Sequence, residues 1–79
     1  MNTLKNQMDE AAYKTLLKTS PLLIAELKGM LQSGQTARRI EHFLMHKYGS
    51  GNLTATSAAC AAYHIEAHPE LLNEKESSQ

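Results

Sequence analysis

The sequence has no valine or tryptophan, and its aromatic residues are one phenylalanine and three tyrosines. β-Branched and aromatic side chains are favoured in pleated sheets, so their scarcity argues against a β-rich fold. The apolar residues are instead eleven leucines, ten alanines, four methionines and three isoleucines. Most of these lose little side-chain freedom in a helix. We therefore predict one all-α domain, and its 79 residues leave a small core that association with another subunit would help to stabilise.

Two other absences limit the cellular compartments and the binding partners that we expect for this protein. A single cysteine, Cys60, excludes an internal disulfide and is compatible with a reducing cytoplasm. No apolar run approaches the length of a membrane span, and the N-terminus has no apolar leader. We therefore expect a soluble, cytoplasmic protein without a membrane partner.

Net charge is zero, but the charges are unevenly distributed along the chain. Residues 1–50 carry seven Lys and Arg against four Asp and Glu, whereas residues 51–79 carry one Lys against four Glu. Such asymmetry is typical either of a basic binding surface with an acidic tail or of two solvated halves.

Catalytic motifs are also absent. The sequence has no glycine-rich phosphate loop, no nucleophile motif and no pair of carboxylates placed for general acid and base catalysis. Cys60 and His64 share a helix face at i, i+4 spacing, but no third group to orient the histidine is evident. A lone cysteine in an alanine-rich helix is commonly a small core residue. We expect neither enzymatic activity nor a cofactor.

Capping residues and apolar spacing divide the chain into four expected helices. Ser20 provides a capping oxygen before Pro21, which suits the first helical position because it has no N–H to satisfy there. Gly34 can adopt the left-handed conformation that ends a helix, and Thr36 can cap the next one. The four helices are expected at about residues 4–18, 21–33, 36–48 and 54–67.

The C-terminal half is divided by the flexible sequence Gly-Ser-Gly at 49–51, after which Asn52 or Thr54 caps the fourth helix. Pro69 begins a short final turn with the sequence PELL. The linkers are short, so we predict one helical bundle over residues 1–72. The polar residues 73–79 are predicted to be a disordered tail.

Two histidine pairs, His42 with His46 and His64 with His68, have the spacing that places both rings on one helix face, and Cys60 extends the second pair. Zinc accepts such ligands. Each helical residue advances by about 100°, however, so His42 and His46 lie opposite the apolar side of the third helix. Packing by that side would turn them away from the fourth helix. We therefore expect surface histidines and no metal site. The apolar side consists of Ala37, Ile40, Leu44 and Tyr48, flanked by Phe43.

The polar side of the third helix is the candidate binding surface. Arginine forms bidentate bonds to phosphate or carboxylate, and histidine gains positive charge as pH falls towards its pKa. A solvated helix face without a partner would have a similar composition. We call this set the basic surface, and its members are Arg38, Arg39, His42, His46 and Lys47.

The second to fourth helices resemble a helix-turn-helix in outline, which would imply DNA binding. Residues 49–53 make a longer connection than the usual three- or four-residue turn. The fourth helix also lacks the Arg, Lys, Asn or Gln that normally make bidentate base contacts. Zero net charge does not favour phosphate binding unless the basic surface acts alone or is doubled in a dimer.

Small residues on the fourth helix would let another helix approach closely. This patch either packs within the same chain or forms the interface of a homodimer or of a complex with a partner helix. We call it the alanine face, and its members are Ala55, Ala58, Ala59, Ala62 and Ile65.

These observations favour a small helical regulator, inhibitor or adaptor that binds a protein partner through an exposed helix face. Such a protein would suit a bacterium or a phage as an accessory factor. The alternative function is that of a helix-turn-helix-like DNA-binding transcriptional regulator.

Overall fold

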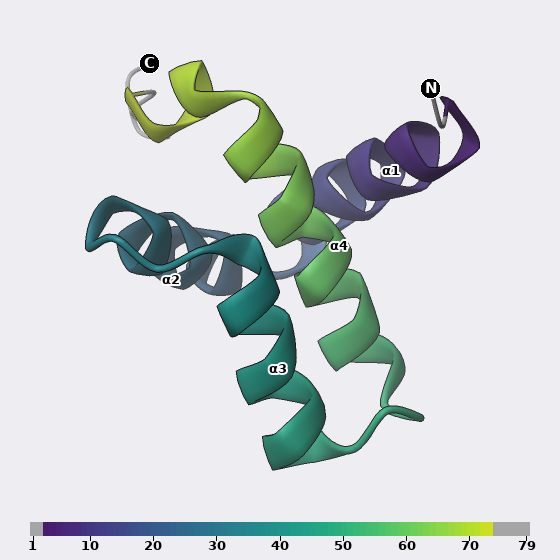
Figure 1. Ribbon diagram of the computed structural model, residues 1–79. Helices are drawn as coiled ribbons and strands as arrows, with labels where there is room; N and C mark the ends of the chain where they lie inside the picture. Colours follow the sequence, from purple (N-terminus) through teal and green to yellow (C-terminus); the bar gives the residue numbers. More distant parts are fainter. Residues whose placement is uncertain (1–2, 74–79) are drawn as a thin grey trace.

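A computed structural model describes residues 3–73, which form four α-helices and a short C-terminal 3₁₀-helix (Figure 1). In Figure 1, α3 and α4 lie side by side, with α1 and α2 behind them. The predicted all-α bundle is confirmed, and each predicted helix boundary lies within one residue of the observed one. The elements are α1 (Thr3–Thr19), α2 (Pro21–Gln32), α3 (Ala37–Tyr48), α4 (Leu53–Ala67) and η1 (Pro69–Asn73).

Side-chain caps begin two of the helices. The Thr36 hydroxyl accepts a hydrogen bond from the Arg39 N–H at 3.1 Å, and the Asn52 side-chain oxygen accepts one from the Ala55 N–H at 2.8 Å. Because these caps satisfy N–H groups that have no partner inside the helix, they fix where α3 and α4 start.

The predicted side-chain cap at Ser20 is wrong, although Ser20 does precede the first residue of α2. Ser20 stands at the N-cap position and Pro21 follows it, but the Ser20 side chain makes no capping hydrogen bond. The Leu23 N–H, which that side chain would bind, donates instead to the Ser20 carbonyl at 3.0 Å. The start of α2 therefore depends on backbone hydrogen bonding and on the proline ring.

Glycine ends α2 and α3. Gly34 has a φ of +104° and Gly49 has a φ of +90°. Side chains with a Cβ rarely adopt this left-handed region, so glycine is the residue that fits. The helix end predicted at Gly34 is confirmed, and the two turns set the directions in which α3 and α4 leave.

The helix at the centre of the bundle is α4. Its contacts with α1 and α3 are the most extensive in the described chain, and it also packs on α2. All five residues of the alanine face are buried within the chain, and so is Ala61. Of the two arrangements predicted for the alanine face, the structure has the intrachain one. The other buried apolar residues are Tyr13, Leu16, Ile24, Leu27, Ala37, Ile40 and Leu44.

The first helix is only partly covered. Tyr13 and Leu16 are buried against the core, whereas Leu4 and Met8 are exposed, although all but Tyr13 follow one four-residue spacing. In Figure 1 the N-terminal turns of α1 extend beyond the side of α4, although Lys5 in this part still lies 4.4 Å from the centre of the Tyr63 ring of α4. The four-residue spacing of apolar residues therefore predicts that α1 is a helix, but it does not predict which part of α1 is buried.

The C-terminal turn packs back on the bundle. The Gln32 side-chain amide donates a hydrogen bond to the Leu72 carbonyl at 2.9 Å, joining η1 to the end of α2. Asn73, predicted as the first residue of the tail, is the last residue of η1, and residues 74–79 lie outside the described part. No helix within residues 3–73 is long and apolar enough to span a membrane.

Candidate functional site

The structure divides the predicted basic surface into two parts. All five of its members are exposed. Arg38, Arg39 and His42 line a shallow hollow of about 320 Å³, whereas Lys47 borders a different and larger cavity. Two guanidinium groups beside an imidazole could bind an anion. The binding role of these residues remains a prediction.

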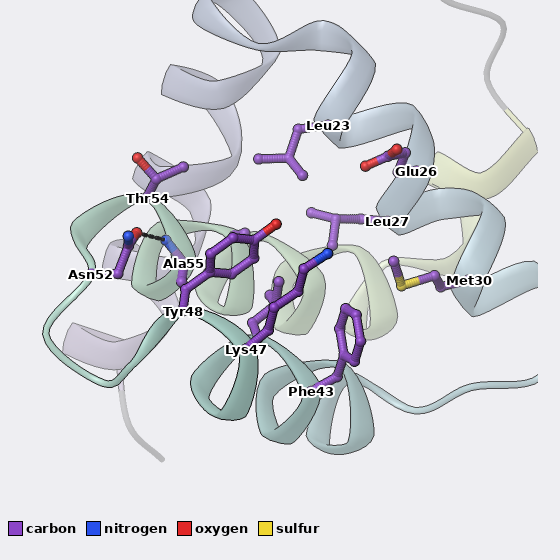
Figure 2. Close-up of a pocket in the computed structure, with 12 residues that line it drawn as sticks. Leu23, Glu26, Leu27, Met30, Phe43, Lys47, Tyr48, Asn52, Thr54 and Ala55 are labelled. Atoms are coloured by element: carbon purple, nitrogen blue, oxygen red, sulfur yellow. Dashed lines mark hydrogen bonds between the residues drawn. The ribbon is translucent and has the colours of Figure 1, made fainter.

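The larger cavity is a groove between α2 and α3 with a volume of about 650 Å³ (Figure 2). It exists because both helices pack on α4 while making few contacts with each other. In Figure 2, the labelled α2 residues form one wall, the labelled α3 residues form the other, and the start of α4 closes one end. We call this the α2–α3 groove. It is lined by Leu23, Glu26, Leu27, Met30, Phe43, Leu44, Lys47, Tyr48, Asn52, Thr54, Ala55 and Ala58.

Small residues on α4 give the α2–α3 groove its depth. Ala55 and Ala58 line it where α4 passes beneath, and both are almost fully buried. Leu27 and Leu44 are buried beside them. Because alanine has only a methyl side chain, α4 leaves room between the two walls that larger residues would fill.

Two aromatic residues on the α3 wall are only half covered. The sequence placed Tyr48 on the packing side of α3 with Phe43 beside it, but Tyr48 is 52% exposed and Phe43 is 50% exposed. On this side of α3 the helix α2 makes few contacts with α3, and both rings border the groove that lies between the two helices. Half-exposed aromatic rings beside a cavity are typical of surfaces that bind proteins or ligands.

Charged groups of opposite sign lie on the two walls. Glu26 belongs to α2 and Lys47 to α3 (Figure 2). The Lys47 ammonium lies 5.6 Å from the centre of the Phe43 ring and 5.2 Å from that of the Tyr48 ring. Within residues 3–73, neither Glu26 nor Lys47 forms an ion pair with another side chain. Both charges therefore remain available to a partner.

A polar network that the sequence did not predict joins α1, α3 and α4. The Lys5 ammonium contacts the buried Asp9 carboxylate at 3.0 Å and lies 4.4 Å from the centre of the Tyr63 ring. The Tyr63 hydroxyl donates to the Glu41 carboxylate at 2.6 Å. That hydrogen bond raises the pKa of Tyr63 to about 12. These contacts fix the neighbouring helices relative to one another.

Cys60 borders this network, and its environment does not activate it. Burial raises the pKa of the Cys60 thiol above its usual value, and the neighbouring Asp9 raises it further. A nucleophilic cysteine requires the opposite shift, because the thiolate is the reactive form. Cys60 is nevertheless only half-buried and is not part of the buried core, where the sequence suggested it would lie.

The histidine pairs have different environments. His42 and His46 are exposed on α3, whereas His64 is half-buried. The His64 ring lies with its centre 5.0 Å from that of Tyr13 and 4.6 Å from that of His68. Within residues 3–73, no three His, Cys, Asp or Glu side chains are grouped so that they could hold a metal ion.

The position of His64 leads to a pH-dependent stability. Burial lowers the pKa of His64, and His68 lowers it further, while Glu10 and Asp9 of α1 oppose the shift. The unfolded chain binds this proton near pH 6.5, but the folded chain does so only at lower pH. The contribution of neutral His64 to the free energy of unfolding is therefore complete above about pH 6.5. It is lost as the pH falls towards the pKa of His64 in the folded chain.

We expect His64→Gln to flatten this part of the pH profile, because glutamine does not titrate. Urea denaturation from about pH 8 to about pH 5 measures the free energy of unfolding across this window. The wild-type protein should lose more stability than the variant as pH falls. Parallel profiles would show that His64 does not carry the effect.

Comparison with known proteins gives no match to a protein-family model, a curated protein or a solved structure. The geometry and chemistry of the surfaces are therefore what bears on the function. Lys47, Phe43 and Tyr48 could be singled out in the sequence, but the groove that they border could not, because the angle between α2 and α3 leaves no periodic signal in the sequence.

Proposed function

We propose that this chain is a non-catalytic protein-binding module, a small regulator, inhibitor or adaptor, and that the α2–α3 groove is its docking surface. The observation that carries the proposal is an apolar groove with half-exposed aromatic residues on one wall. Grooves of this kind bind the apolar face of an amphipathic helix, which places side chains at i, i+4 and i+7 between the walls. The high pKa of the Cys60 thiol is consistent with the absence of catalysis.

Two further exposed apolar residues are chain neighbours of residues that line the groove. Leu22 precedes the lining residue Leu23 on α2, and Leu53 lies between the lining residues Asn52 and Thr54 at the start of α4. Leu22 and Leu53 are both 82% exposed. Exposed apolar residues mark protein-binding surfaces when they cluster, and Phe43 and Tyr48, which line the same groove, are the ones that support this function.

A direct binding assay tests this function. The probe is a fluorescently labelled amphipathic helical peptide with leucines at i, i+4 and i+7, and the control is a peptide of the same composition in scrambled order. Fluorescence anisotropy should show saturable binding of the amphipathic peptide and much weaker binding of the scrambled one. Equal binding of the two peptides would contradict a groove that selects a helix face.

DNA binding remains the alternative, and the hollow lined by Arg38, Arg39 and His42 is the observation that favours it. The helix-turn-helix version is poorly supported, because α4 contributes much of the core and has no base-reading side chains. The same anisotropy assay with a short DNA duplex separates the two functions. Binding of the duplex that weakens steeply with salt, without binding of the peptide, would favour DNA.

A further inference from the structure

We propose that the α2–α3 groove is occupied by a second copy of this chain, related by a two-fold axis, with α3 of each copy lying in the groove of the other. This inference rests on the proposed function, because it names the partner of the same docking surface. A two-fold interface uses one surface twice, so that surface must be complementary to itself.

The charges of the groove have this self-complementarity. Glu26 on the α2 wall and Lys47 on the α3 wall have opposite signs, and neither forms an ion pair within the described chain. When α3 of one copy lies beside α2 of the other, Lys47 meets Glu26 of the second copy. The two-fold axis then forms this ion pair twice. The zero net charge of the chain adds no long-range repulsion between copies.

The apolar residues of the groove are complementary in the same way. The helix that forms one wall, α3, also carries the half-exposed Phe43 and Tyr48. Leu23 and Met30 on the opposite wall are only partly buried and supply apolar surface to receive them. One helix thus provides both a wall of its own groove and the side chains that could fill a second groove.

The composition of the core favours association with a second copy. Six of the thirteen buried apolar residues in the described chain are alanines, so the core is thin and would gain from further burial.

Sedimentation equilibrium of charge variants tests the proposal. The wild-type protein should form dimers, and Glu26→Lys or Lys47→Glu should each raise the dimer dissociation constant about tenfold or more, because each places two pairs of like charges together. The double variant exchanges the two signs and should restore dimerisation. Lys18→Glu is the matched control, because Lys18 is exposed on α1 and does not line the groove, and the same charge reversal there should leave the dimer unchanged.

Other outcomes overturn the second-copy inference. A wild-type protein that stays monomeric at about 1 mM would exclude a dimer of useful affinity. In that case, binding of the amphipathic peptide would leave the proposed function standing. A dimer that is insensitive to the single variants, or not restored in the double variant, would place the interface elsewhere on the chain. Circular dichroism of each variant checks that its helices are intact.

Discussion

Replacing Ile65 with alanine should lower the free energy of unfolding by about 2–5 kcal/mol. The Ile65 side chain is 0% exposed and belongs to α4, which packs on both α1 and α3. The substitution removes buried methyl and methylene groups and leaves a cavity that rigid neighbouring helices fill only in part. A domain of this size has a total stability of about 4–12 kcal/mol, so the loss would be a large fraction. Urea denaturation followed by far-ultraviolet circular dichroism measures it.

Leu22→Ala is the matched control, because it removes the same number of carbon atoms from an exposed position on α2. At protein concentrations where the chain is monomeric, we expect a change within about 0.5 kcal/mol. A loss of stability from Leu22→Ala as large as that from Ile65→Ala would contradict a core centred on α4.

Exchanging both Phe43 and Tyr48 for serine should weaken binding of the amphipathic peptide about 30-fold or more, which corresponds to about 2 kcal/mol. Buried aromatic residues dominate the binding energy of many interfaces, and these two rings offer much of the apolar area on the α3 wall. Half of each residue is already exposed in the free chain, so the fold should lose less stability than the complex. Fluorescence anisotropy gives the affinity, and thermal denaturation checks the fold.

A second pair of exposed apolar residues provides the control for this experiment. Leu4 and Met8 on α1 are also exposed, but neither lines the α2–α3 groove. Replacing both with serine makes the surface similarly more polar and should leave peptide binding unchanged. If the Leu4 and Met8 variant loses affinity to the same extent, the peptide recognises general surface hydrophobicity and the groove is not its binding site.

The helices could be predicted from the sequence because their limits depend on local chemistry. Pro21, Gly34 and Thr36 act on the backbone within one turn of their own positions, and Gly49 and Asn52 do the same before α4. Such signals involve only near neighbours in the chain, so they can be identified without knowing the tertiary structure.

Contacts between residues far apart in the chain had no comparable signal in the sequence. The Glu66 carboxylate of α4 accepts a hydrogen bond from the Ala37 N–H at 2.9 Å, and thereby helps to satisfy the start of α3. The burial of Asp9 likewise depends on the approach of α4 and on the Lys5 ammonium. Residues that satisfy one another across 29 positions cannot be paired from helical spacing alone.

The candidate site likewise has some features that the sequence predicted and others that depend on how the helices pack. Helical spacing placed Arg38, Arg39 and His42 on an exposed face, and they are exposed. The α2–α3 groove was missed because it depends on the angle between two helices, which periodicity does not define. Tyr48 was assigned to the packing side of α3 and Phe43 to its edge, and only the position of α2 shows that about half of each residue stays exposed.

Nuclear magnetic resonance mapping of peptide binding tests the central claim most directly. The ¹⁵N-labelled protein is titrated with the unlabelled amphipathic peptide, and amide shift changes are assigned along the chain. We expect the changes to concentrate on the walls of the α2–α3 groove, around Leu27 on α2 and from Phe43 to Tyr48 on α3, with little change at Leu4. Shifts centred on Arg38 and Arg39, or no shifts at all, would contradict the groove as the docking surface.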